Sequence, residues 1–275
     1  MYFDFRLDLG YQQLMSQRPL DVDHRWAKIG SDPFPFQTLR QNTRDRMRKS
    51  RAVEIDLPNE WANRDSINGK FALHAQSWQL RIAGPKRTAI PIATLRMVYI
   101  RGQKNEIINT WIFPVRCDAI PVYAAELIAV NGVTRVAFVD IQTPGLNDRS
   151  AEEVAELTAP LAARFSMLPC DESAPDWAIA ETGGNFTYAR KADASWNSTI
   201  QDCYLSYLDT YMDSFTSSLD TKQMAATSED VDKTEQLSCY QKHHMESSPG
   251  KKFLGSLFGV EWTDTFLTNF LFSKP

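Results

Sequence analysis

One glutamate stands in the middle of an otherwise apolar stretch of this 275-residue sequence. Glu126 alternates with three apolar residues, which share one face if the stretch is a strand: Val122, Ala124 and Ile128. Burying an unpaired carboxylate is costly, so a carboxyl group on an apolar face should be paired, protonated or functional. Glu126 is therefore a candidate for acid–base chemistry. The alternative is an edge strand on which Glu126 faces solvent.

Two other sets of residues could bind a metal, but their spacing argues against it. His243 and His244 are adjacent, and adjacent side chains on a helix point about 100° apart. This geometry favours a solvated or substrate-facing pair over a chelate. The cysteines form no C-x-x-C pair, which argues against zinc and iron–sulfur sites and against a disulfide framework. We expect four reduced thiols: Cys117, Cys170, Cys203 and Cys239.

Common cofactor motifs are missing from the sequence. It contains no G-x-G-x-x-G, P-loop, H-E-x-x-H or G-x-S-x-G pattern, and Gly183-Gly184 alone indicates only the start of a strand. The net charge of −4 gives no reason to expect nucleic acid or an anionic membrane as partner. We find no signal peptide and no apolar stretch of about 20 residues, the length of a membrane span. A cytoplasmic protein is expected.

The elements that carry these residues alternate with a period of two over much of the chain. A basic helical stretch at 40–51 precedes β-rich runs that begin near Gln76. Asn131-Gly132 separates two such runs, 122–130 and 133–141, and is a strong hairpin signal because a type I′ turn needs positive φ at both central residues. Antiparallel neighbours are predicted there, which disfavours a Rossmann sheet.

Helical periodicity returns after the hairpin. Ser150 to Glu153 reads as a capping box that opens a helix, and Pro160 should kink or break that helix. Apolar residues three and four apart predict an amphipathic helix over 200–215. Residues 216–234 are polar and read as a mobile loop, and Gly259 separates two C-terminal helices. The pattern is that of one α/β domain with a central antiparallel sheet and helices packed against it.

Several segments of the chain resemble the ferredoxin-dependent bilin reductases. The most specific is the C-terminal FGVEWTDTFLTNFLF at 258–272, within a similar stretch at 240–272. Other segments agree in order and spacing: NEIINTWIFP (105–114), IPVYAAELIAV (120–130), VAFVDIQTP (136–144) and YLDTY (207–211). The resemblance covers residues 76–275, and residues 1–70 form a divergent N-terminal part.

The resemblance implies a three-layer α/β/α sandwich around a central antiparallel β-sheet, in a single monomeric domain spanning 1–275. An open-chain tetrapyrrole would lie between the sheet and the C-terminal helices. No bound flavin, nicotinamide, haem or metal is implied. Reduced ferredoxin would supply electrons singly, and the bilin itself would hold the radical between steps. The expected substrate is biliverdin IXα or a dihydrobiliverdin, and the protein would bind, orient and protonate it.

The resemblance also implies roles for individual residues. Glu126 takes the place of the family's central aspartate and would be the principal proton donor; the chlorophyll-catabolite branch also has glutamate here. Asn109 lies where the enzymes that make phycocyanobilin have histidine and several on the phycoerythrobilin side have asparagine. Asn109 would orient the substrate, which favours the phycoerythrobilin side, or would simply pin the strand.

A second acid of the family is missing from this sequence. Its aspartate aligns with Ser248, which with Pro249 would also make a good helix start. Glu246, His243, His244 or an ordered water could replace it as second proton donor. Two other functions stay open: reduction of a chlorophyll-derived open-chain tetrapyrrole, which Glu126 supports, and a bilin carrier without catalysis, which Ser248 suggests.

Charged and aromatic residues complete the expected site. Trp111, within the matched strand segment, is expected to contact the substrate. Basic side chains should bind the propionates, since lysine and arginine suit carboxylates. The basic run at 40–51 is a solvated helix face or a docking surface for acidic ferredoxin. The candidates for the propionates are Arg96, Arg101, Lys251 and Lys252.

Overall fold

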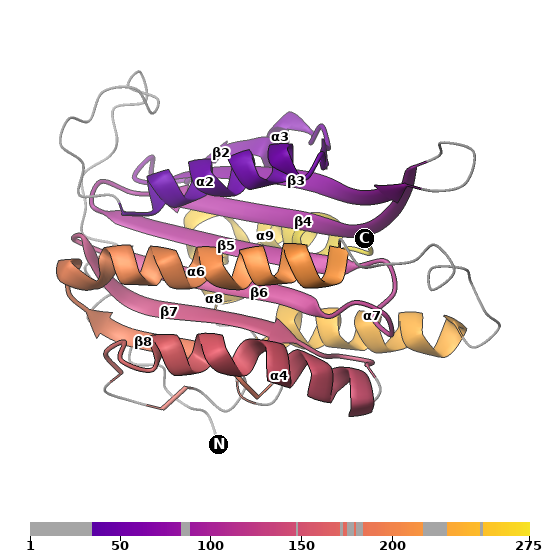
Figure 1. Cartoon of the computed structure of the whole chain (residues 1–275). Helices are drawn as coiled ribbons and strands as arrows, with labels where there is room; N and C mark the ends of the chain where they lie inside the picture. The colour runs from indigo at the N-terminus through magenta and orange to yellow at the C-terminus, as the bar shows by residue number, and fades with distance from the viewer. Residues whose placement is uncertain are drawn as a thin grey trace.

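The computed structural model describes residues 35–83, 89–146, 148–170, 173–174, 179, 184–216, 230–247 and 250–275. Within these residues an antiparallel sheet of eight strands forms the centre of the molecule, in the order β1-β3-β4-β5-β6-β7-β8, with β2 paired to β3 (Figure 1). The strands are β1 (Val53–Glu54), β2 (Asn63–Asp65), β3 (Ala72–Ala83), β4 (Ala89–Arg101), β5 (Asn105–Pro114), β6 (Val122–Val130), β7 (Val133–Gln142) and β8 (Thr187–Ala192).

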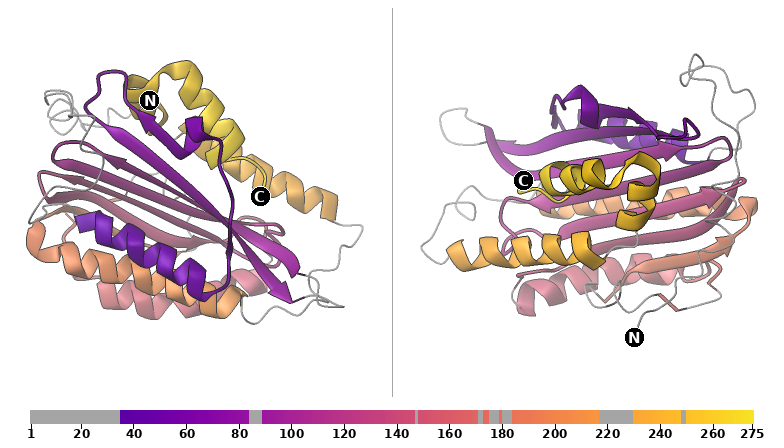
Figure 2. Two further views of the ribbon diagram at one scale, coloured as in Figure 1. Left: turned by 90° about the horizontal axis from the view of Figure 1, so that it is seen from above. Right: turned by 180° about the vertical axis from the view of Figure 1, so that it is seen from behind.

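Helices cover both faces of the sheet, which confirms the three-layer α/β/α sandwich (Figures 1 and 2). One face carries α2 (Pro35–Lys49), α4 (Asp148–Phe165) and α6 (Asn197–Tyr211). The other carries α7 (Asp230–Ser247), α8 (Gly250–Phe258) and α9 (Val260–Phe266). Among the described residues, no helix combines the length and the apolar character needed to cross a membrane. The short elements are α3 (Asn59–Ala62), η3 (Ala194–Trp196), η4 (Met212–Thr216) and η5 (Leu267–Leu271).

Two hydrophobic cores form because successive side chains of a strand point to opposite faces of the sheet. On β5, Ile108 and Ile112 pack toward α2 and α6, whereas Trp111 and Phe113 pack toward α7, α8 and α9. Both cores contain fully buried aromatic rings from helices as well as strands, such as Tyr204 on one side. The parity of a residue along its strand therefore decides which layer it faces.

The predicted hairpin is confirmed. β6 and β7 are antiparallel neighbours, and Asn131 and Gly132 have φ of 54° and 74° between them. Positive φ at both central positions is what a type I′ turn requires.

Two expectations about the helices need correction. α4 begins at Asp148, before the predicted capping box, and is not broken at Pro160, one of the two outcomes predicted there. Pro160 and Glu156, whose carbonyl loses its helical donor, are both solvent-exposed, so water can satisfy that carbonyl. Residues 216–234 were expected to form a mobile loop, but α7 already begins at Asp230. Residues 217–229 of this interval lie outside the described residues.

Gly259 ends α8 in a backbone conformation that other residues avoid, with φ 94° and ψ 143°. Gly259→Ala should lower the free energy of unfolding by about 1–3 kcal/mol, because side chains are strained in this region. The matched control is Gly255→Ala, in the interior of α8, where an added Cβ would make only an ordinary 3.6 Å contact with Val260. That variant should be neutral or more stable. Urea unfolding measures both, and equal midpoints would contradict the expectation.

Candidate active site

The register of the sheet places Asn109 directly opposite Glu126, on neighbouring strands β5 and β6. Glu126 is opposite Phe138 on β7, and Phe138 is opposite Tyr188 on β8, so the four residues form a row across the sheet. The row lies on the face toward α7, α8 and α9, because Trp111, two positions from Asn109, belongs to the core on that side. The two residues expected to handle the substrate are therefore neighbours.

Glu126 has the environment of a proton donor. Its side chain is half-buried, and no hydrogen bond or ion pair joins it to another residue that the structure describes. Burial without a charged partner disfavours the carboxylate and raises the pKa of Glu126 to about 7. At neutral pH the carboxyl group can give up a proton and take it back.

Asn109 is also half-buried, and its Oδ1 atom is buried without a hydrogen-bond partner among the described residues. A buried amide oxygen that lacks a donor is destabilising until a ligand or water supplies one. Opposite side chains in an antiparallel pair lie about 5 Å apart at Cβ. One ligand N–H could therefore reach Asn109 while the atom beside it reaches Glu126.

Half-exposed apolar side chains surround this pair and form what we call the sheet-face patch. Ile128 follows Glu126 on the same face of β6, and Phe138 stacks on Phe186 with ring centroids 5.7 Å apart. Such a surface can hold a flat, apolar ligand with the carboxyl group of Glu126 against it. The patch consists of Asn109, Glu126, Ile128, Val136, Phe138, Phe186 and Tyr188.

An aromatic cluster borders the patch one row away. The Trp111 ring stacks on Phe113 at 5.6 Å and meets the edges of three further rings. These rings come from α7 and from residues 271–275, which we call the C-terminal segment, so they join both to the sheet. They belong to Tyr240, His244 and Phe272.

Arg96 fastens the C-terminal segment over the cluster. Its guanidinium donates hydrogen bonds to the carbonyl oxygens of Leu271, Ser273 and Lys274, at 3.2, 2.6 and 2.9 Å. It also lies over the Phe113 ring at 5.4 Å. Burial lowers the pKa of Arg96 to about 10, so the group remains charged at neutral pH.

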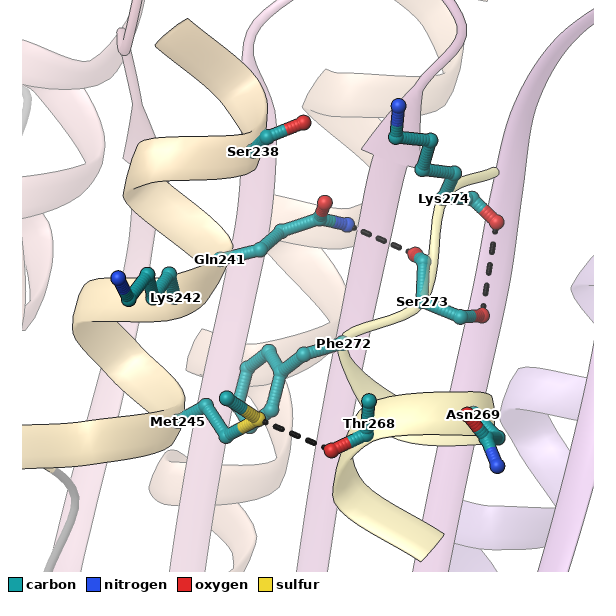
Figure 3. Close-up of a pocket in the computed structure, with 9 residues that line it drawn as sticks. All are labelled: Ser238, Gln241, Lys242, Met245, Thr268, Asn269, Phe272, Ser273 and Lys274. Carbon is teal, nitrogen blue, oxygen red and sulfur yellow. Dashed lines mark hydrogen bonds between the residues drawn. The ribbon is translucent and has the colours of Figure 1, made fainter. Parts of the chain in front are cut away.

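A groove of about 370 Å³ runs between α7 and the C-terminal segment (Figure 3). Gln241 donates a hydrogen bond across it to the Ser273 carbonyl at 2.9 Å. Phe272 lines the groove and also contacts Trp111, so this ring separates the groove from the aromatic cluster. The other lining residues are Ser238, Lys242, Met245, Thr268, Asn269 and Lys274.

Comparison with known proteins now identifies the family. The family model described as ferredoxin-dependent bilin reductase matches residues 40–273. The chain belongs to this family. It is 24% identical over 180 residues to the phycocyanobilin:ferredoxin oxidoreductase of Trichodesmium erythraeum (strain IMS101). The aligned region covers 63% of this chain and 68% of that protein. The match from residue 40 extends the similarity beyond the segments that showed it in the sequence.

A solved structure has the same fold as this chain. Phytochromobilin synthase from tomato, crystallised in complex with biliverdin, superimposes with a TM-score of 0.68 at 16% identity. The superposition covers 86% of this chain and 82% of the tomato protein. At this identity the likeness concerns the fold.

One predicted propionate ligand lies on the wrong side of the sheet for this site. Arg101 donates a hydrogen bond from Nη1 to Gln37 of α2 at 3.1 Å, on the face opposite to Glu126. Arg96 is on the correct face but would have to release backbone carbonyls before binding a propionate. Lys251 pairs with Asp264 at 2.8 Å and ties α8 to α9, and Lys252 is exposed.

The residues proposed as second proton donors lie at the end of α7. His243 is half-buried and Glu246 is exposed, one and two residues from the buried His244. Ser248 and Pro249 lie outside the described residues. Helix α7 therefore carries His243 and Glu246 to the border of the site, and their roles remain predictions.

The basic run at 40–51 lies mostly on α2, across the sheet from the patch. Two of its arginines bind within the fold. Arg46 forms an ion pair with Asp209 at 2.6 Å, and Arg40 donates a hydrogen bond to Gln76 at 3.2 Å. The exposed cations gather at the end of the run: Arg48, Lys49 and Arg51.

The sequence indicated His244 as a substrate-facing residue or a proton donor, but its contacts with the aromatic cluster were not predicted. Its ring centroid lies 5.0 Å from Trp111 and 4.4 Å from Tyr240. A signal was present, because Leu237, Tyr240 and His244 recur at three- and four-residue steps, the spacing of one buried helix face. The tether formed by Arg96 had no such signal, since it binds backbone carbonyls.

Proposed function

We propose that this protein reduces a linear tetrapyrrole, biliverdin IXα or a dihydrobiliverdin, with electrons taken singly from reduced ferredoxin. Membership of the bilin reductase family supports the reaction class. The observation that carries the proposal is Glu126, a half-buried carboxyl group with a pKa of about 7 on the sheet-face patch. The tetrapyrrole would lie flat on the patch, between the sheet and the C-terminal helices.

The reaction balances with two electrons and two protons. Two reduced ferredoxins are oxidised in turn, and one carbon–carbon double bond of the tetrapyrrole becomes a single bond with a hydrogen on each carbon. After the first electron the tetrapyrrole holds the radical, and Glu126 donates a proton to it. Asn109 accepts a hydrogen bond from a ring N–H through its unpartnered Oδ1 and fixes the orientation. Its presence favours the phycoerythrobilin side of the family.

A second proton must come from another group or from Glu126 after it is reprotonated. His243 and Glu246, on the last turns of α7, are the candidates among the described residues. Ser248, which lies outside them, would bind substrate rather than protonate it, because a serine hydroxyl is a poor acid near pH 7. Trp111 contacts the substrate from the next row of the sheet.

Charged side chains supply the remaining contacts. Lys251 and Lys252 on α8 are the cations that would bind the propionates. To do so, Lys251 would exchange its exposed ion pair with Asp264 for an ion pair with a propionate. Ferredoxin, an acidic protein, docks on the exposed cations at the end of the basic run, Arg48, Lys49 and Arg51.

The test begins with purified protein and biliverdin under anaerobic conditions. An absorbance change on mixing shows binding, and bleaching or a blue shift after addition of reduced ferredoxin shows turnover. No change on mixing would refute the proposal. Binding without turnover would favour a carrier.

A second candidate substrate is a chlorophyll-derived open-chain tetrapyrrole. The glutamate at position 126 favours it, because the chlorophyll-catabolite branch has the same residue there. Parallel turnover assays with both substrates, at equal ferredoxin concentration, decide between them.

A further inference from the structure

Two buried ring nitrogens beside the sheet-face patch lack hydrogen-bond partners. The Trp111 and His244 side chains are only 8% and 3% exposed. Trp111 Nε1 and His244 Nε2 are buried, and neither bonds to any residue in the described part of the chain. The two rings contact each other, with centroids 5.0 Å apart. Leaving a buried polar group unpaired is costly, so two such groups in contact indicate a place for a polar ligand group.

The position of this pair relative to Glu126 follows from the register. Trp111 is opposite Ala124, which is two residues from Glu126 on the same face of β6. Two residues of strand span about 7 Å. His244 lies over the Trp111 row, one helical turn after Tyr240, which bonds to Gln142. A tetrapyrrole in contact with Glu126 and Asn109 would therefore extend to the pair with one of its rings.

The chemistry of the two nitrogens is complementary. Indole Nε1–H can only donate a hydrogen bond. Burial, with His243 nearby, lowers the pKa of His244 to about 3, so the imidazole is neutral at pH 7 and one of its nitrogens is an acceptor. A lactam presents a carbonyl and an N–H on adjacent atoms. With hydrogen bonds of about 2.9 Å, one lactam can bridge two rings in contact.

We propose that Trp111 and His244 form a lactam-binding subsite. The indole N–H donates to the lactam carbonyl, and His244 Nε2 accepts from the lactam N–H. Tyr240, Phe113 and Phe272 enclose the pair, and this apolar wall strengthens both hydrogen bonds by excluding water. The subsite would fix which end of the tetrapyrrole lies near Glu126. The inference rests on the proposed function, since it takes a terminal ring of that substrate as the ligand.

Variants at the two positions test the subsite through biliverdin binding. Trp111→Phe keeps an aromatic ring but removes the donor, and His244→Leu removes the acceptor. Each should raise the Kd for biliverdin about tenfold, the effect of one hydrogen bond to a desolvated group. His244→Gln keeps an acceptor at similar reach and should retain most of the affinity. Phe258→Leu, a buried ring of the same core that packs on Trp262, controls for lost packing and should change the Kd less than threefold.

The infrared spectrum of bound biliverdin gives a readout that packing alone would not move. Loss of the indole donor should shift the lactam carbonyl stretching band to higher frequency in Trp111→Phe, whereas the band should stay in place in Phe258→Leu. An unchanged band, or equal affinities of the wild type and His244→Leu, would overturn the subsite while the proposed function stands. Failure of the wild type to bind biliverdin would overturn both.

Discussion

Glu126→Gln is expected to lower the rate of ferredoxin-driven tetrapyrrole reduction by about 10²- to 10⁴-fold, the usual contribution of a positioned general acid. Glutamine has nearly the same shape but cannot release a proton near pH 7. The fold should be preserved, because no described residue depends on Glu126 for a hydrogen bond. Anaerobic single-turnover spectroscopy would then show accumulation of the one-electron-reduced tetrapyrrole.

The pH dependence of the wild type gives a second, independent measure. The acid form of Glu126 donates the proton, and this form is lost as pH rises through the pKa of about 7. Where protonation limits the rate, turnover should be constant below pH 6 and fall towards tenfold per pH unit above pH 8. This limb should be missing in Glu126→Gln. A wild-type rate that stays flat to pH 9 would show that another group is the donor.

Stability should respond to the same titration with a sign that can be worked out. Because the folded pKa of Glu126 is above its ordinary value, the unfolded chain releases this proton first as pH rises. The wild type therefore loses stability between about pH 4.5 and pH 7, where the unfolded chain has released the proton and the folded chain still holds it. Glu126→Gln avoids this loss, so its gain in Tm over the wild type should grow across that range and remain constant above it.

A matched control is available on the other side of the molecule. Glu156 is exposed on α4, so Glu156→Gln removes one carboxylate without touching the sheet-face patch. Its rate and pH profile should equal those of the wild type. If both glutamine variants lost activity equally, net charge or ferredoxin association would explain the effect, and Glu126 would not be the donor.

The sequence predicted the sheet and the position of Glu126 because both depend on local patterns. Alternation along 122–128 fixed the face of Glu126, and Asn131-Gly132 fixed its partner strand. The same rule of alternation, applied to β4, would have separated Arg96 from Arg101, since residues five apart on a strand point to opposite faces. Alternation therefore indicates that only one of the two arginines can lie on the face of Glu126.

Other features depend on tertiary contacts that no local pattern encodes. The Arg96 tether joins a strand to carbonyl oxygens about 175 residues later, and backbone acceptors look alike in any sequence. The contact between Trp111 and His244 depends on where α7 crosses the sheet. Pro160 was predicted to disrupt α4 by a rule for helix interiors, but its exposed position allows water to replace the lost bond.

A buried carboxyl group on the opposite face, Glu106, should have the largest effect on stability. It is 1% exposed and accepts two hydrogen bonds, from the backbone N–H of Phe36 at 2.9 Å and from the Tyr99 hydroxyl. Phe36 lies in the first turn of α2, whose N–H groups have no partner within the helix. Glu106 therefore caps α2 from the sheet, where a negative charge also suits the helix dipole.

Glu106→Ala should lower the free energy of unfolding by about 3 kcal/mol, because both donors would remain buried without an acceptor. Burial, assisted by the Glu106 carboxyl group, raises the pKa of Tyr99 far above its ordinary value, so its hydroxyl is always a donor. Urea unfolding followed by circular dichroism measures the loss. An unfolding midpoint equal to that of the wild type would show that α2 does not depend on this cap.

Two further variants distinguish the cap from a general effect of altering the core. Tyr99→Phe removes one donor and should cost about 1 kcal/mol, leaving the bond to Phe36 intact. In the double variant Glu106→Ala/Tyr99→Phe the unpaired hydroxyl is gone, so the total loss should be smaller than the sum of the single losses. Asp45→Ala, which removes an exposed carboxylate from α2 itself, should stay within about 0.5 kcal/mol of the wild type. Strict additivity would mean that Glu106 and Tyr99 act separately and that the bond between them adds nothing to stability.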